Sequence, residues 1–197
     1  MKEIALVILG IATVLVGAFA YQQQHVAAAS EPLAHVRNEF EFTVHAPYAV
    51  TAPLFGPEGE RAWGGEHWDP HFFYPQPAQD VRGAVFMVEH GHHRSYWINT
   101  AFDVEGRHIQ YAFVIPDLMA TLIDLRFSEV DATDTKVSVA YERTALTAEA
   151  NEHVREAGIS DSKAGTEWSK AVNDYLARKH AGNAEPASSA SPINKAP

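Results

Sequence analysis

The chain has 197 residues and a mass of 21.7 kDa, which suits one ordinary core with extra segments at its ends. Its formal net charge is -10, and its Lys and Arg residues, 15 in all, are scattered. A general nucleic-acid surface needs clustered basic residues, so we expect no nucleic-acid partner. The chain contains no cysteine, which excludes disulfides, thiol catalysis and thiolate metal sites.

An uncharged run from Ile4 to about Tyr21 follows the charged residues Lys2 and Glu3. It is long for a signal peptide yet barely long enough to cross a hydrocarbon core of roughly 30 Å. We therefore predict that residues 1–21 are either a signal peptide, cleaved after Ala20 or Ala29, or a single transmembrane anchor. Residues 22–38 are interpreted as a linker, and the domain is expected outside the cytoplasm.

A half-buried strand is predicted from Glu39 to Ala46, where apolar and polar residues alternate strictly. A short helix could run from Pro47 to Leu54. A second short helix has Gly56 as its N-cap and Pro57 at its first position, with Glu58 and Glu60 as favourable charges near its positive end. Gly64 and Gly65 end this second helix.

Further strands are predicted in close succession, as in an antiparallel meander. They are an edge strand through Phe72 and Phe73, then Gly83–His90, Arg94–Phe102, Arg107–Ile115, Leu118–Ser128 and Thr135–Leu146. Alternation assigns large side chains to the inner face: Tyr96, Ile98, Phe102, Ile109, Tyr111, Phe113, Thr121, Ile123, Leu125, Phe127, Val137, Val139 and Tyr141.

A long helix is predicted from a Thr147 cap to about His180, interrupted or bent near Gly158 and Gly165. Its last turns bury one face, with Trp168, Val172, Tyr175 and Leu176 at helical spacing. Residues 181–197 are rich in Ala, Ser and Pro, so we expect a disordered tail. The folded domain is therefore placed at residues 39–180.

These elements occur in the order of the α+β helix-grip fold, in which a curved antiparallel sheet of about seven strands wraps around a long C-terminal helix. The chain resembles the SRPBCC superfamily of START-like, birch-pollen-allergen-like and polyketide cyclase/dehydrase-like proteins. In particular, it is similar to bacterial members with a PEGER-W...WDP-YP signature. The matching residues are Pro57 to Arg61, Trp63, Trp68 to Pro70, Tyr74 and Pro75, with Tyr141 to Leu146 and Trp168 to Leu176 in support.

The resemblance implies a cavity between the sheet and the C-terminal helix that binds an apolar small molecule or lipid. Such a ligand would be held mainly by desolvation, because each buried methylene contributes about 0.8 kcal/mol. The predicted cavity and mouth residues are Phe42, Trp63, Trp68, Tyr96, Tyr111, Phe113, Phe127 and Trp168. The alternative is that these aromatic side chains fill the space as an ordinary core.

A metal site is the weaker hypothesis for the opening of this domain. In an extended segment, His67, Asp69 and His71 would project from one face, and two imidazoles with a carboxylate can bind zinc. Asp69 also belongs to the family signature, where capping a turn is a sufficient role. We expect no cofactor.

No nucleophile elbow, dinucleotide-binding motif or phosphate loop occurs in the sequence. Asp124 and Arg126 share a strand face, but alternation places them outside as a solvated pair. We therefore favour a non-catalytic binding module. It would be anchored in the bacterial cytoplasmic membrane with its domain on the periplasmic side, or soluble in the periplasm or secreted after cleavage. The alternatives are a cyclase or dehydratase that uses cavity-facing His or Tyr, and an interaction module resembling chaperone activators.

Overall fold

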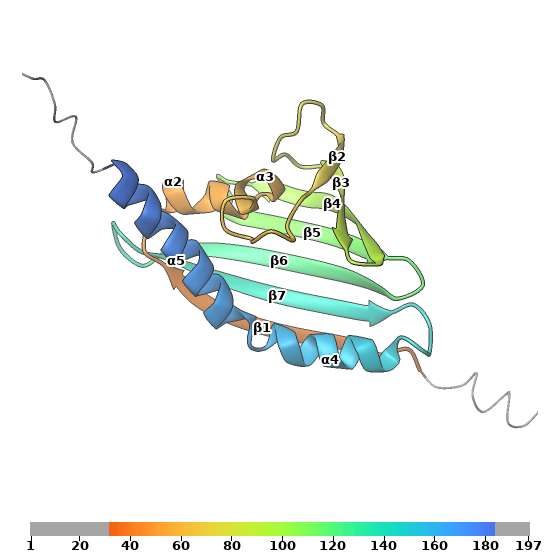
Figure 1. Ribbon diagram of the computed structural model, residues 1–197. Coiled ribbons are helices and arrows are strands. Elements are labelled where there is room, and N and C mark those ends of the chain that lie inside the picture. The colour runs from red at the N-terminus through yellow and green to blue at the C-terminus, as the bar shows by residue number, and fades with distance from the viewer. Residues whose placement is uncertain (1–31, 184–197) are drawn as a thin grey trace, which may run out of the picture.

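The computed structural model describes residues 32–183 and confirms the predicted helix-grip architecture. One antiparallel sheet has the strand order β1-β7-β6-β5-β4-β3-β2 (Figure 1). The strands are β1 (His35–Val44), β2 (His71–Tyr74), β3 (Val85–His90), β4 (His93–Asp103), β5 (His108–Ile115), β6 (Met119–Glu129) and β7 (Thr135–Ala145). The segment predicted as a leader or anchor lies outside the described residues. Within residues 32–183, no helix is both long and apolar enough to cross a membrane.

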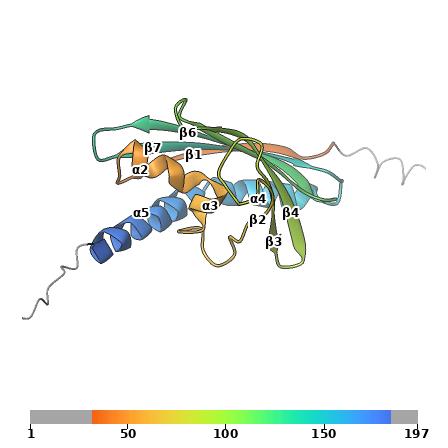
Figure 2. The same ribbon diagram turned by 90° about the horizontal axis from the view of Figure 1, so that it is seen from above.

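The helices lie on one face of the curved sheet (Figures 1 and 2). Two short helical turns, α2 (Tyr48–Thr51) and η1 (Ala52–Phe55), are followed by α3 (Pro57–Glu60). The C-terminal helices are α4 (Asn151–Asp161) and α5 (Ala164–Asn183). Gly56 is the N-cap of α3 with Pro57 in its first turn, as the sequence predicts. The main core is the aromatic and aliphatic layer between the sheet and these helices.

The predicted inner face of β4 is wrong for its first half. Tyr96 and Ile98 are 44% and 47% exposed, whereas Trp97 is buried. The pairing of β4 with β5 shifts register between Asn99 and Ala101, and such a bulge inserts one residue into the alternation. Phe102, beyond the bulge, still packs against the core. A strict two-residue alternation through the bulge would place Tyr96 on the same face as Phe102, which is the wrong face.

The long C-terminal helix is interrupted between Gly158 and Gly165, as predicted, because α4 ends at Asp161 and α5 begins at Ala164. The N-cap of α4 is Ala150, which makes no side-chain hydrogen bond to the helix. The prediction of Thr147 as the N-cap is therefore wrong. A Cβ atom added at Gly165 in α5 would lie 3.0 Å from Cδ2 of Phe40 on β1. A Cβ atom added at Gly158 in α4 would lie 3.0 Å from Cγ2 of Val36, also on β1. The two glycines therefore let the helices approach β1 closely.

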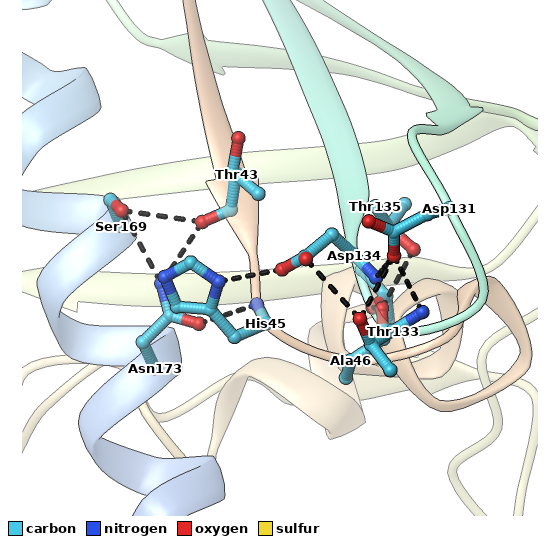
Figure 3. Close-up of polar contacts among 10 residues, drawn as sticks. Thr43, His45, Ala46, Asp131, Thr133, Asp134, Thr135, Ser169 and Asn173 are labelled. Atoms are coloured by element: carbon cyan, nitrogen blue, oxygen red, sulfur yellow. Dashed lines mark hydrogen bonds and ion pairs between the residues drawn. The ribbon is translucent and has the colours of Figure 1, made fainter.

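Helix α5 is joined to the end of β1 by side-chain hydrogen bonds (Figure 3). The Asn173 Oδ1 atom accepts from the His45 backbone N–H at 2.8 Å, and its Nδ2 group donates to the Thr43 carbonyl at 3.0 Å. On its other side, His45 contacts Asp134 through Nδ1 at 2.6 Å. With Val172 and Leu176 buried against the sheet, these bonds fix where α5 crosses it.

Candidate functional site

A small cavity lies between α3, the sheet and α5, and we call it the aromatic cavity. Its volume is about 150 Å³, and its lining consists of Glu60, Trp63, Gly64, Trp68, Trp97, Tyr111, Ile123, Tyr141 and Trp168. These residues include all four tryptophans of the chain. Trp63, Trp68 and Trp168 are half-buried, whereas Trp97, Tyr111 and Tyr141 are buried. The half-buried indoles therefore form the outer part of the cavity.

Helix α3 carries Glu60 into the cavity because Asp80, far along the chain, fixes the start of the helix. The Asp80 carboxylate accepts hydrogen bonds from the backbone N–H groups of Glu58 at 2.8 Å and Gly59 at 3.1 Å. It thus satisfies first-turn donors of a helix that has no side-chain cap of its own. Glu60, the last residue of α3, is only 7% exposed in this arrangement.

Glu60 and Tyr111 form the polar centre of the cavity. Both side chains line the cavity, and the Tyr111 hydroxyl donates to the Phe55 carbonyl oxygen. The proton of the phenol is thus engaged with the backbone.

The electrostatics of the cavity favour the neutral form of Glu60. Burial raises the pKa of the Glu60 carboxyl well above its usual value, and the nearby Asp80 carboxylate raises this pKa further. The Tyr111 hydroxyl lowers this pKa by less. Burial likewise raises the pKa of the Tyr111 phenol well above its ordinary value, with Glu60 adding to the effect.

The indole N–H groups around the cavity bind to the protein itself. Trp63 donates to the Leu54 carbonyl at 2.6 Å, and Trp68 donates to the Pro57 carbonyl at 2.9 Å. Trp97 donates to the Ser95 hydroxyl at 2.7 Å. These bonds fix the orientation of the three rings and engage their N–H donors.

A buried ion pair supports the far wall of the cavity behind Tyr141. Arg143 contacts Asp161 of α4 through two N–H···O bonds, of 2.6 and 2.7 Å. The two side chains are 12% and 8% exposed, and the guanidinium carbon lies 4.7 Å from the Tyr141 ring centroid. Burial raises the pKa of the Tyr141 phenol, and the positive charge of Arg143 opposes this shift.

The predicted ligand-binding residues fall into three groups. Trp63, Trp68, Tyr111 and Trp168 line the cavity. Phe42, Phe113 and Phe127 are buried in the surrounding core without lining it. Tyr96 lies on the opposite face of the sheet, for the reason given by the β4 bulge. The two alternatives for the interior are thus both realised in part, because aromatic packing fills most of the space and leaves a small cavity.

The proposed metal triad does not form. The structure holds no group of three His, Asp or Glu side chains arranged to bind a metal within residues 32–183. Asp69 instead pairs with Arg61, which also binds Glu58 at 2.8 Å, and His71 Nε2 lies 3.3 Å from Asp69. The guanidinium links α3 to the Asp69-Pro70 turn, so the carboxylate has a structural partner.

The pair of Asp124 and Arg126 lies on the outer face, as predicted. Arg126 Nε contacts an Asp124 oxygen at 3.0 Å, while His108 and Gln110 contact the other oxygen, each at 2.7 Å. Burial acts to raise the pKa of Asp124, but these three hydrogen bonds outweigh it and the pKa is lowered. The ionised form of Asp124 is therefore favoured, and this cluster lies away from the aromatic cavity.

Sequence reasoning missed Glu60 by treating it as a helix-start charge. A usable signal was present, because Pro57, Glu60 and Trp63 recur at three-residue spacing and so share one face of a helical segment. An acidic residue between two residues that pack inward is a candidate buried acid. Trp97 was missed through the β4 bulge, and Tyr141 was assigned to the inner face but not to the site.

No family model and no curated protein sequence matches this chain. Solved structures do match it. Ara h 8.0201 superposes with a TM-score of 0.56 and 15% identity, over 74% of this chain and 99% of that one. An uncharacterized protein from Rhizobium leguminosarum superposes with a TM-score of 0.53 and 16% identity, over 75% of this chain and 97% of that one. Norcoclaurine synthase from Thalictrum flavum, solved with dopamine and hydroxybenzaldehyde, superposes with a TM-score of 0.52 and 11% identity, over 78% of this chain and 91% of that one. What the chain shares with these proteins is the fold, which is the one that the SRPBCC resemblance implies.

Proposed function

We propose that this protein binds a compact, largely apolar small molecule in the aromatic cavity. The observation that carries the proposal is an interior space of about 150 Å³ with four indoles and two phenols in its lining. A fold that simply packed its core would leave no such space at the junction of sheet, α3 and α5, since interiors are normally close-packed. Ligand binding between sheet and helix is also what the resemblance implies.

The volume narrows the class of ligand. An apolar cavity of this size can hold a benzene-sized molecule, whereas pockets for drug-sized ligands begin at roughly 300 Å³. The expectation of a lipid ligand therefore gives way to a smaller molecule, unless the half-buried indoles move outward. Removing such a molecule from water, with few polar contacts, provides the binding free energy.

Tryptophan fluorescence is a direct test, because every tryptophan of the chain lines the cavity. We expect benzene and phenol to change the emission in a saturable way. Ile123→Phe should fill the cavity and abolish the change, whereas Ile159→Phe, the same substitution at a residue that is 60% exposed, should not affect it. The proposal fails if no compact probe binds the folded protein, or if binding is insensitive to Ile123→Phe while the variant remains folded.

A second candidate function is acid-base catalysis, favoured by one observation. The cavity contains a buried carboxyl whose pKa is raised, next to a phenol. A carboxyl with such a pKa can transfer protons near neutral pH, which dehydratase chemistry requires. Turnover of a compact β-hydroxy carbonyl compound that is lost in Glu60→Gln and retained in Glu58→Gln would support it. Turnover that is equal in both variants would exclude Glu60 as the acid or base.

We also propose, from the sequence alone, that residues 1–21 place this domain on the outer side of a bacterial cytoplasmic membrane. The support is the uncharged run after Lys2, which matches a signal or anchor in length and flanking charge. If the domain is anchored, protease added to intact spheroplasts should digest it. If the leader is cleaved, the domain should be found in the medium. A domain that is protected until the cells are lysed would contradict this location.

A further inference from the structure

We propose that the aromatic cavity selects a small organic cation, such as an alkylammonium group, over neutral molecules of the same size. This inference rests on the proposed function and names its ligand class. It is carried by what the cavity offers to a ligand, namely aromatic ring surfaces on several sides and one acidic side chain, with no basic side chain in the lining.

Four hydrogen-bond donors of the lining are already bonded to the protein. The N–H groups of Trp63, Trp68 and Trp97 bind Leu54, Pro57 and Ser95, and the Tyr111 hydroxyl donates to Phe55. An anion that needs donors finds these four engaged. A ligand that carries positive charge meets ring surfaces and the carboxyl of Glu60 instead.

Aromatic rings enclose the cavity from several directions. Trp168 meets Trp63 at 64° and Tyr141 at 79°, with centroid separations of 5.5 and 6.3 Å. Trp97 similarly meets Trp68 at 88° and Tyr111 at 78°, with separations of 5.4 and 6.1 Å. Rings set at large angles surround a compact object, whereas a parallel stack accepts a flat one. Such aromatic enclosures recognise quaternary ammonium groups through cation–π attraction.

The charges around the cavity also favour a cation. Of the nine lining residues, Glu60 is the only acid, and none is Lys, Arg or His. Asp80 adds negative potential from behind α3, as its effect on both Glu60 and Tyr111 shows. The positive charge of Arg143, behind Tyr141, is paired with Asp161 through Nε and one terminal nitrogen. The net charge of -10 attracts cations at longer range.

Binding of a cation should be linked to a proton. The empty cavity keeps Glu60 neutral because a lone charge there is poorly solvated. A ligand with a fixed positive charge would provide the missing partner, so the Glu60 carboxyl would release its proton to the buffer and bind as the carboxylate. Affinity should then increase with pH until Glu60 is already ionised in the free protein.

The test compares tetramethylammonium with tert-butanol, a neutral molecule of similar shape with the same number of non-hydrogen atoms. Calorimetry in two buffers of different ionisation enthalpy gives affinity and protons released. We expect tetramethylammonium to bind at least about tenfold more tightly than tert-butanol, which one or two cation–π contacts can supply. Glu60→Gln should remove this preference and the proton release, and leave tert-butanol binding unchanged.

A second pair of variants separates ring electronics from packing. Trp168→Phe keeps an aromatic ring in the cavity and should retain most of the preference, whereas Trp168→Leu should lose it. Equal binding of tetramethylammonium and tert-butanol would overturn the cation proposal while leaving compact-ligand binding intact. If neither of these molecules nor benzene binds, the proposed function itself is wrong. A preference that survives Glu60→Gln with unchanged proton release would also overturn the proposed role of Glu60.

Discussion

The carboxyl of Glu60 on α3 and the phenol of Tyr111 on β5 line the same cavity inside the domain, and both residues are buried. This arrangement brings the short-helix layer against the centre of the sheet. It also places a titratable group beside an apolar space, where its charge state depends on burial rather than on solvent. The stability and the binding properties of this domain are therefore linked through one carboxyl.

Glu60→Gln should stabilise the protein at alkaline pH. The pKa of Glu60 is raised in the folded state, so the folded protein keeps a proton that the unfolded chain loses above the ordinary Glu pKa. The free energy of unfolding therefore falls as pH rises from that value toward the folded pKa, by at most about 1.4 kcal/mol per pH unit.

Urea denaturation at several pH values measures this effect as the difference between Glu60→Gln and the wild type. Asp80, whose pKa is also raised by burial, is present in both proteins, so its own titration contributes to both curves. Glu58→Gln, on the more exposed side of α3, is the matched control and should follow the wild type. A difference that does not change with pH would show that Glu60 is not held neutral.

Tyr111→Phe should destabilise the domain by about 1–3 kcal/mol. The change leaves the Phe55 carbonyl without its hydrogen-bond partner, while the ring and its packing are kept. Tyr141→Phe, which alters another phenol of the same cavity, should have a smaller effect. Thermal unfolding of both variants would decide, and equal destabilisation would argue against a special role for the Tyr111 hydroxyl.

Asp161→Ala should be among the most damaging substitutions on α4, at about 3–5 kcal/mol, because it leaves the buried Arg143 guanidinium unpaired. Adding Arg143→Met should recover much of that loss. A double-mutant cycle in chemical denaturation measures the coupling between the two. Additive effects of the single changes would mean that the pair contributes no coupling energy.

The same substitution at two glycines of α5 should have opposite effects. Gly165→Ala places a Cβ atom 3.0 Å from Phe40 and should destabilise the protein by about 1–3 kcal/mol through overpacking. A Cβ atom at Gly182 meets nothing within 4 Å, so Gly182→Ala should stabilise by up to about 1 kcal/mol through helix propensity. Melting temperatures that change in the same direction would contradict the close approach of α5 to β1.

Two neighbouring aromatic residues of β4 test the reversed face of this strand. Trp97→Ala should destabilise the domain by about 3–5 kcal/mol, because the ring is buried and lies 4.1 Å from that of Phe113, centroid to centroid. Tyr96→Ala, on the outer face, should cost less than about 1 kcal/mol. A lower denaturation midpoint for Tyr96→Ala than for Trp97→Ala would instead support the alternation predicted from the sequence.

The sequence by itself determined the class of fold and the order of its elements. Alternation in β5, β6 and β7 is unbroken, so Tyr111, Ile123 and Tyr141 could be assigned to the inner face from spacing alone. Gly56 and Pro57 marked the start of α3 in the same way, because capping preferences are local. Four of the eight predicted ligand-binding residues line the cavity, namely Trp63, Trp68, Tyr111 and Trp168.

Only the tertiary structure decided the chemistry of the site. The bulge in β4 depends on pairing with β5. Because of it, Trp97 rather than Tyr96 faces the core. Asp80 caps α3 from a distant loop and thereby buries Glu60, which the local pattern made a surface charge. The volume of the cavity depends on how closely glycines let α5 approach β1. Propensity and periodicity act over a few residues, whereas burial of a carboxyl and the size of a cavity are set by contacts between segments far apart in the chain.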